Sequence, residues 1–150
     1  MNTIYLGLGS SLGDKEIIMK KTLIEIEKWG ENFKSSSFFY SEPWGGVAQN
    51  QFLNTACRID IKNISPEELL QKIHALELKF NRTRTIKWED RTLDIDILLY
   101  GNQHIQTKKL IIPHQYLLER DFVYTPLLEI FEKKYSYEDL KSYINIIIKK

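Results

Sequence analysis

Four stretches of the chain show the hydrophobic patterns of β-strands. Successive strand side chains point to opposite faces, so alternation of apolar and polar residues predicts one face directed into a core. The predicted strands cover residues 3–8, 35–40, 52–61 and 91–100. In the third, every second residue from Leu53 to Ile61 shares a face. The fourth ends in the apolar run ILLY, which predicts an interior strand of the sheet.

Two helices are predicted between these strands, where apolar residues recur every three or four positions. The first follows a tight glycine turn in GLGSSLG, with Asp14 as its cap and Gly30 as its stop. The second begins in SPEELL, where Ser65 and Glu68 form a capping box. Nearer the C-terminus, PHQYLLERDF and TPLLEIFEK are predicted as short helices or turns, and a last helix starts at Ser136.

The order of the first six elements predicts the fold class. Strand, helix, strand, strand, helix and strand give a βαββαβ order, typical of an α+β domain with a ferredoxin-like core. We expect a mostly antiparallel sheet with these two helices on one face, followed by additional C-terminal helices. No internal repeat or linker divides the sequence, so we expect one domain over residues 1–150.

Composition excludes several classes of function. The 150 residues are 43% hydrophobic, which suits one compact domain with a core. The net charge of +1 argues against a general binder of nucleic acids or membrane surfaces, because these need a broad basic field. A single cysteine and the lack of a membrane-length apolar run or a signal-like N-terminus predict a cytoplasmic protein.

The clearest candidate for chemistry is a pair of carboxylates in RTLDIDILLY. Asp94 and Asp96 share one face of the predicted strand, and each disfavours ionisation of the other unless a cation lies between them. An ordinary solvated strand face is the alternative, although aspartate is depleted in strands. Oxygen ligands suit Mg²⁺, which binds one or two carboxylates and completes its shell with water and phosphates. The pair therefore indicates phosphate chemistry.

A group of cations precedes this strand. The segment RTRTIKWED supplies Arg82, Arg84 and Lys87 ahead of Arg91. Together with Mg²⁺ these side chains could neutralise a polyphosphate. The acidic residues that close the segment leave a solvated charged loop as the alternative. The P-loop signature is absent, and the glycines of GLGSSLG are spaced too widely for a dinucleotide-binding motif.

Aromatic residues supply a second candidate feature. Trp44, Phe52, Trp88 and Phe122 lie near predicted loops or strand ends, where a flat ligand could stack on their faces. Packing in the core is the alternative for each of them. Asn54 follows Phe52 by two residues on the same strand face, where its amide could hydrogen-bond a heterocycle in plane.

The order of the motifs resembles one enzyme family over nearly the whole chain. GLGSSLGD, SEPWG, FLNTA, ELLQKIHALE, RTLDIDILLYG, IPH and ERDFVYTPLLEI follow one another as in the 6-hydroxymethyl-7,8-dihydropterin pyrophosphokinases of folate biosynthesis. The resemblance implies transfer of pyrophosphate from ATP to the pterin hydroxymethyl group, with release of AMP. It also implies that Asp94 and Asp96 hold two Mg²⁺ ions on the ATP phosphates.

The resemblance further implies roles for individual residues. Those expected to contact ATP are Glu77, Arg84, Lys87, Trp88, Arg91, His114 and Arg120. Those expected to bind the pterin are Glu42, Pro43, Trp44, Phe52, Asn54, Trp88, Asp94 and Phe122. Those expected to act in catalysis are Arg82, Arg91, Asp94 and Asp96. The sequence departs from the family's pattern after Trp88, where Glu89 and Asp90 replace a common Gly-Pro.

Two other functions stay open at this point. Another Mg²⁺-dependent phosphoryl or nucleotidyl transferase would use the same carboxylates, and its products would distinguish it. A ferredoxin-like RNA-binding module would place aromatics on its sheet face. The sequence lacks the aromatic strand motif of such modules, so we expect small-molecule substrates, no nucleic-acid or membrane partner, and a monomer.

Overall fold

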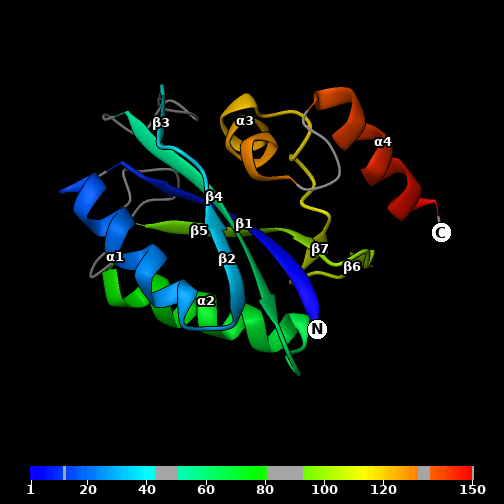
Figure 1. The fold of residues 1–150 in the computed structure, drawn as a ribbon, viewed down its shortest axis with the longest axis horizontal. Helices are drawn as coiled ribbons and strands as arrows, with labels where there is room; N and C mark the ends of the chain where they lie inside the picture. Colours follow the sequence, from blue (N-terminus) through cyan, green and yellow to red (C-terminus); the bar gives the residue numbers. More distant parts are fainter. Residues whose placement is uncertain (12, 43–50, 81–92, 132–135, 150) are drawn as a thin grey trace.

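The computed structural model describes residues 1–11, 13–42, 51–80, 93–131 and 136–149. Its described elements form a central sheet with helices on both faces (Figure 1). Several predicted site residues lie outside the described residues, namely Pro43, Trp44, Arg82, Arg84, Lys87, Trp88 and Arg91.

The main sheet has five strands, and every described pair in it is antiparallel. Its order is β2 (Glu31–Ser35), β4 (Phe52–Ile61), β1 (Asn2–Ser10) and β5 (Asp94–Tyr100), while β3 (Phe39–Ser41) also pairs with β4. The short strands β6 (Ile105–Gln106) and β7 (Ile111–Ile112) form a separate sheet. The predicted α+β class and ferredoxin-like order are confirmed.

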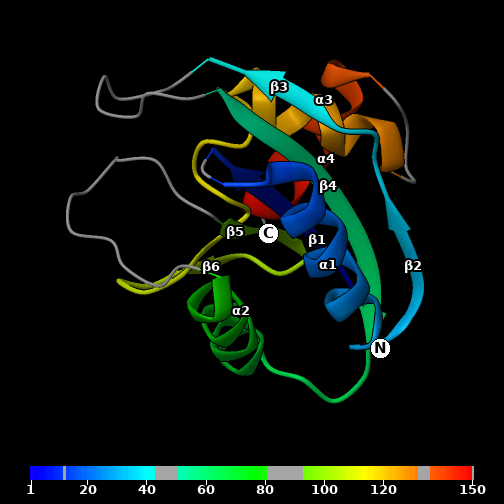
Figure 2. The same ribbon diagram turned by 90° about the vertical axis from the view of Figure 1, so that its left-hand side faces the viewer.

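Two layers of helices enclose the sheet. α1 (Lys15–Glu27) and α2 (Pro66–Phe80) cover one face, and α3 (Asp121–Ile130) and α4 (Tyr137–Ile148) cover the other (Figures 1 and 2). Two clusters of buried side chains match these layers, because Met19 and Ile73 pack in one while Leu127 and Ile144 pack in the other. The expectation that the first two helices share one face is therefore confirmed, and the additional C-terminal helices cover the other face.

The central strand β4 has the bounds predicted from the sequence. Its residues from Leu53 onward are buried on both faces of the sheet. Cys57 faces the cluster under α1 and α2, whereas its neighbour Ala56 faces the cluster under α3. Burial raises the pKa of the Cys57 thiol far above its usual range, so this side chain is a neutral part of the core.

The single strand predicted over residues 35–40 is wrong, because β2 ends at Ser35 and β3 begins at Phe39. Ser36 is buried at this break. Its N–H donates to the Ala56 carbonyl at 2.8 Å, and the Ala56 N–H donates to the Ser36 hydroxyl at 3.0 Å. The hydroxyl therefore takes the place of a backbone carbonyl as acceptor, and side-chain bonds of this kind compete with a strand ladder.

The expectation that the aspartate strand is interior is also wrong. Among the described strands, β5 pairs only with β1 and forms an edge of the sheet. Its outer backbone groups are nevertheless bonded. The Ile95 N–H donates to Glu77 Oε2 at 2.8 Å, and the Leu98 carbonyl accepts from the His114 N–H at 3.0 Å. The apolar run in β5 is buried because α2 and the chain around His114 cover this edge.

The capping box predicted before α2 is confirmed, and α4 begins at the predicted Ser136 with a capping bond of its own. Before α2, the Ser65 N–H donates to Glu68 Oε1 at 3.0 Å and the Glu68 N–H donates to Ser65 Oγ at 3.1 Å. Before α4, the Ser136 hydroxyl accepts from the Asp139 N–H at 3.1 Å. These bonds satisfy N–H groups that have no partner within the first helical turn.

Other predicted helix boundaries need correction. Asp14 precedes α1, but its side chain makes no capping hydrogen bond, and α1 ends at Glu27 rather than at Gly30. A Cβ on Gly30 would lie 2.0 Å from the Asp60 carbonyl oxygen, so this glycine allows close approach to β4. α3 is one helix that runs through Pro126. No helix within the described ranges is long and apolar enough to span a membrane.

Candidate active site

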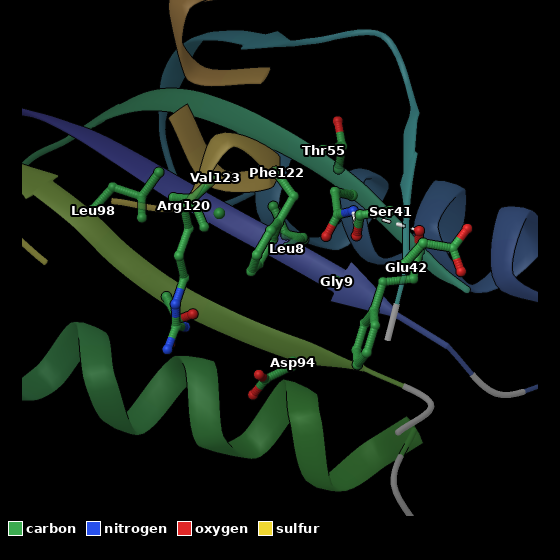
Figure 3. A pocket seen from close by; sticks show the side chains of 14 residues that line it. Leu8, Gly9, Ser41, Glu42, Thr55, Asp94, Leu98, Arg120, Phe122 and Val123 are labelled. Atoms are coloured by element: carbon green, nitrogen blue, oxygen red, sulfur yellow. Dashed lines mark hydrogen bonds between the residues drawn. The ribbon is translucent and has the colours of Figure 1, made fainter. Parts of the chain in front are cut away.

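Two pockets meet at Asp94 and Asp96 of β5. The face pocket lies on the sheet below α3 and is lined by residues of β1, β3, β4, β5 and α3 (Figure 3). The edge pocket lies along the outer side of β5, between α2 and the segment that contains β7. Because both aspartates line both pockets, a ligand in either one reaches the same two carboxylates.

The face pocket combines aromatic rings with an oriented amide. Phe52 comes from the start of β4, and Phe122 extends from the start of α3 toward the sheet (Figure 3). Asn54 lines the same pocket, and its Nδ2 donates to Ser41 Oγ at 2.8 Å. An anchored amide between aromatic side chains suits a flat heterocycle with polar edges.

Two glycines of β1 shape the floor of this pocket. A Cβ on Gly7 would lie 3.3 Å from the methyl groups of Leu98, which occupies that space. A Cβ on Gly9 would lie 3.6 Å from both Phe52 Cδ1 and Asn54 Oδ1, so the missing side chain leaves room beside them. The predicted strand ended at Leu8 and left Gly9 to the following turn, whereas Gly9 lies within β1 and lines the pocket.

Three carboxylates, those of Glu77, Asp94 and Asp96, line the edge pocket. Burial raises the pKa of Glu77 to about 7, and the charges of Asp94 and Asp96 add to this effect despite the hydrogen bond from the Ile95 N–H. The described residues contain no group of three or more potential ligands able to hold a metal ion. Two half-buried aspartates beside a crowded third carboxylate nevertheless suit Mg²⁺, which needs one or two protein carboxylates and phosphate oxygens.

His114 lies beside this carboxylate cluster. Its Nδ1 accepts from the Tyr116 N–H at 3.2 Å, so the proton of the neutral ring is on Nε2, which lies 3.8 Å from Asp96 Oδ1. Burial lowers the pKa of His114, the charge of Arg120 lowers it further, and Asp94 opposes both. The neutral imidazole can therefore donate a hydrogen bond from Nε2 into the edge pocket.

Arg120 connects the aromatic and charged parts of the site. Its guanidinium carbon lies 4.3 Å from the centre of the Tyr116 ring and 5.9 Å from that of Phe122. The electrostatic attraction between a cation and the faces of aromatic rings stabilises the guanidinium in this position. Arg120 was predicted to contact ATP, and in the structure it lines the face pocket.

The structure brings most of the described candidate residues together. The predicted residues that line the face pocket are Glu42, Phe52, Asn54, Asp94, Asp96, Arg120 and Phe122. The predicted residues that line the edge pocket are Glu77, Asp94, Asp96 and His114. The edge pocket is also lined by three residues to which the sequence analysis gave no role, namely His74, Lys108 and Lys109. The lysine pair was the available signal, but its place in this pocket depends on the pairing of β6 with β7, which the sequence analysis did not predict.

Comparison with known proteins decides the family. A family model described as 7,8-dihydro-6-hydroxymethylpterin-pyrophosphokinase (HPPK) matches residues 5–132. The chain belongs to this family. The resemblance seen in the sequence motifs is therefore confirmed.

Relatives of the HPPK family differ in length. A 2-amino-4-hydroxy-6-hydroxymethyldihydropteridine pyrophosphokinase from Aquifex aeolicus is 42% identical over 130 residues, which cover 87% of this chain and 81% of that protein. The bifunctional protein FolKE from Lactococcus lactis subsp. cremoris is 40% identical over 139 residues, 91% of this chain but 40% of that protein. The chain thus spans less than half of this bifunctional relative.

Solved structures support the fold of the HPPK family. The structure of HPPK-DHPS A437G with STZ-DHP from Plasmodium falciparum matches with a TM-score of 0.67 at 12% identity. The match covers 99% of this chain and 46% of that one. At this identity the likeness supports the architecture alone.

Proposed function

We propose that this chain transfers pyrophosphate from ATP to the hydroxymethyl group of 6-hydroxymethyl-7,8-dihydropterin and releases AMP. The observation that carries the proposal is the position of Asp94 and Asp96 in the lining of both pockets. One pocket has the rings and amide for a pterin, and the other has carboxylates, a histidine and lysines for a nucleotide. The reacting groups would meet at the aspartates.

The face pocket is proposed as the pterin site. The ring would stack between Phe52 and Phe122, and Asn54 would hydrogen-bond its edge. Glu42, which also lines this pocket, is a further residue proposed to bind the pterin. Pro43, Trp44 and Trp88 complete the predicted set outside the described residues.

The edge pocket is proposed as the ATP site. Glu77 and His114 would contact the nucleotide, and Arg120 would neutralise charge where the two pockets meet. Arg82, Arg84, Lys87 and Arg91, with Trp88, would complete the site from a segment outside the described residues. Phosphoryl chemistry of this kind depends mainly on positioning and on neutralisation of charge.

Asp94 and Asp96 are the residues proposed to hold two Mg²⁺ ions. Bound Mg²⁺ would neutralise the phosphates and orient the β-phosphorus toward the incoming hydroxyl. The chain's own contribution is to hold both carboxylates on a rigid strand, with His114 Nε2 directed at Asp96. A monomeric state and a cytoplasmic location also stay predictions.

The test is an assay of the purified chain with ATP, Mg²⁺ and the hydroxymethyl dihydropterin, followed by separation of the adenine nucleotides. We expect AMP and pterin diphosphate in equal amounts. Asp96→Asn should lower kcat by about 100-fold or more, because the metal contributes several kcal/mol to the transition state. Glu138→Gln, an exposed carboxylate of α4, is the matched control and should behave as the wild type.

Two results would refute parts of the proposal. ADP as the nucleotide product would indicate an ordinary kinase instead of a pyrophosphokinase. Near-normal turnover of Asp96→Asn at ordinary Mg²⁺ concentration would rule out the role of Asp96 as a metal ligand.

A further inference from the structure

Helix α3 is tied to the break between β2 and β3 by one carboxylate. The Ser37 N–H and the Ser37 hydroxyl both donate to Glu129 Oε1, at 2.6 and 2.7 Å. The two residues are 92 positions apart in the chain, and α3 lies alongside β3 (Figure 2). Neither residue lines the face pocket or the edge pocket, so the proposed chemistry leaves this contact unexplained.

The contact lies at the far end of two elements that lead to the face pocket. Phe122 and Glu129 are seven residues apart in α3, which is about two turns and roughly 10 Å along one helix face. Ser37 and Ser41 are four residues apart, about 13 Å in extended chain. α3 and β3 thus run in opposite directions between the Ser37–Glu129 contact and the pocket walls.

The strand side of this contact is fixed to the sheet. Ser36 exchanges two hydrogen bonds with Ala56 of β4, and its hydroxyl lies 2.9 Å from Thr55 Oγ1. At the pocket end, Ser41 Oγ accepts from Asn54 Nδ2. β3 is therefore bonded to β4 near both of its ends, and Ser37 presents its two donors from a fixed position.

The helix side of the contact combines apolar packing with the two hydrogen bonds to Glu129. Leu127 and Ile130 pack α3 onto the sheet, but apolar contacts are non-directional and permit small shifts along the helix axis. Hydrogen bonds to a carboxylate are directional and stronger than neutral ones. Two of them on one oxygen would fix how far Phe122 extends over the pterin pocket.

We propose that Glu129 is a positioning residue that holds α3 against Ser37 and thereby sets the gap in which the pterin ring stacks. This inference rests on the proposed function of the face pocket. It assigns Glu129 no contact with either substrate. Because Phe122 on the same helix lines the face pocket and not the edge pocket, loss of Glu129 should change pterin binding much more than nucleotide binding.

The test uses the variants Glu129→Ala, Ser37→Ala and the double variant. Pterin affinity is measured by fluorescence titration with 6-hydroxymethylpterin at saturating Mg²⁺ and non-hydrolysable ATP analogue, and analogue affinity is measured separately by calorimetry. We expect Glu129→Ala to raise the Kd for the pterin about 3- to 10-fold, in the range for charged hydrogen bonds at an exposed site. The Kd for the analogue should stay within about twofold of the wild type.

Further variants separate positioning from a general loss of structure. Glu129→Gln keeps an oxygen acceptor and should recover part of the pterin affinity, while the double variant should bind no more weakly than Glu129→Ala. Glu138→Ala on α4 is the control for loss of an exposed carboxylate. Ser37→Ala removes only the hydroxyl donor and keeps the N–H donor. It therefore replaces Glu129→Ala in the test if urea titration shows that Glu129→Ala does not fold.

Three outcomes would overturn the inference. Unchanged pterin affinity in both single variants would show that the contact does not set the pocket. Equal weakening of pterin and analogue would indicate general disruption of the fold. Lack of pterin binding by the unchanged chain would refute the proposed function, and the inference with it.

Discussion

Glu77 offers a sharp test of the electrostatics, because its carboxyl group lies half-buried beside two aspartates. Burial and the nearby carboxylates raise the pKa of Glu77 to about 7, and a side-chain hydrogen bond with Asp94 contributes. A hydrogen bond between two carboxyl groups requires a proton on one of them. We therefore expect Glu77 to be largely protonated in the metal-free protein below pH 7, and Glu77→Gln to reproduce that neutral state.

The raised pKa of Glu77 determines how the free energy of unfolding changes with pH. A carboxyl group whose pKa is higher in the folded state binds a proton more tightly there, so its contribution to stability is full below about pH 4.5 and is lost as the pH rises through 7. The difference between the pKa of about 7 in the folded protein and the ordinary value of 4.5 sets an upper limit of about 3 kcal/mol on this contribution. Because Glu77 is partly exposed, solvent screening reduces our expectation to about 1 to 2 kcal/mol.

The assay is urea unfolding of metal-free protein at several pH values between 5 and 8. Wild type should lose about 1 to 2 kcal/mol more unfolding free energy over this range than Glu77→Gln does. Glu67→Gln, on an exposed position of the same helix, should follow the wild type. Parallel curves for wild type and Glu77→Gln would refute the argument. With Mg²⁺ and an ATP analogue present, the two curves should approach each other, because bound cations favour ionised Glu77.

Two further predictions concern the sheet. Asp60→Asn should lower the free energy of unfolding by about 3 kcal/mol, because the buried Arg58 loses its charged partner at 2.9 Å, and pterin affinity of the folded variant should stay unchanged. Urea unfolding and pterin titration check both statements, and an equally stable variant would contradict them. Gly9→Val should weaken pterin binding about tenfold by filling the space beside Phe52 and Asn54, while analogue affinity stays unchanged. An unchanged pterin Kd would show that this space is not used.

The elements that local rules determine were predictable from the sequence. β4 and the start of α2 agree with expectation because alternation and a capping box operate within a few residues. The break at Ser36 depends on hydrogen bonds to Ala56, twenty residues away, so the local pattern read as one strand. Gly30 looked like a helix stop, yet a glycine is needed there because the Asp60 carbonyl of β4 leaves no room for a side chain. Contacts across the sheet explain each of these differences.

The candidate site likewise combines motifs visible in the sequence with contacts that only the fold creates. The carboxylate pair in β5 was visible as a sequence motif, and the family resemblance indicated Glu77 and His114. Their arrangement around the free side of β5 could not be read from the sequence, because it depends on strand order and on α2. The contact between Glu129 and Ser37 likewise joins two polar residues that carry no motif.

The edge position of β5 is what allows one strand to serve both pockets. In an interior strand, neighbouring strands occupy both rows of backbone groups, and side chains reach only the two faces of the sheet. At an edge, the outer backbone groups are open to other partners, and here Ile95 bonds to Glu77 while Leu98 bonds to His114. Those partners bring edge-pocket side chains beside carboxylates that also line the face pocket. A strand added outside β5 would displace them and separate the two pockets.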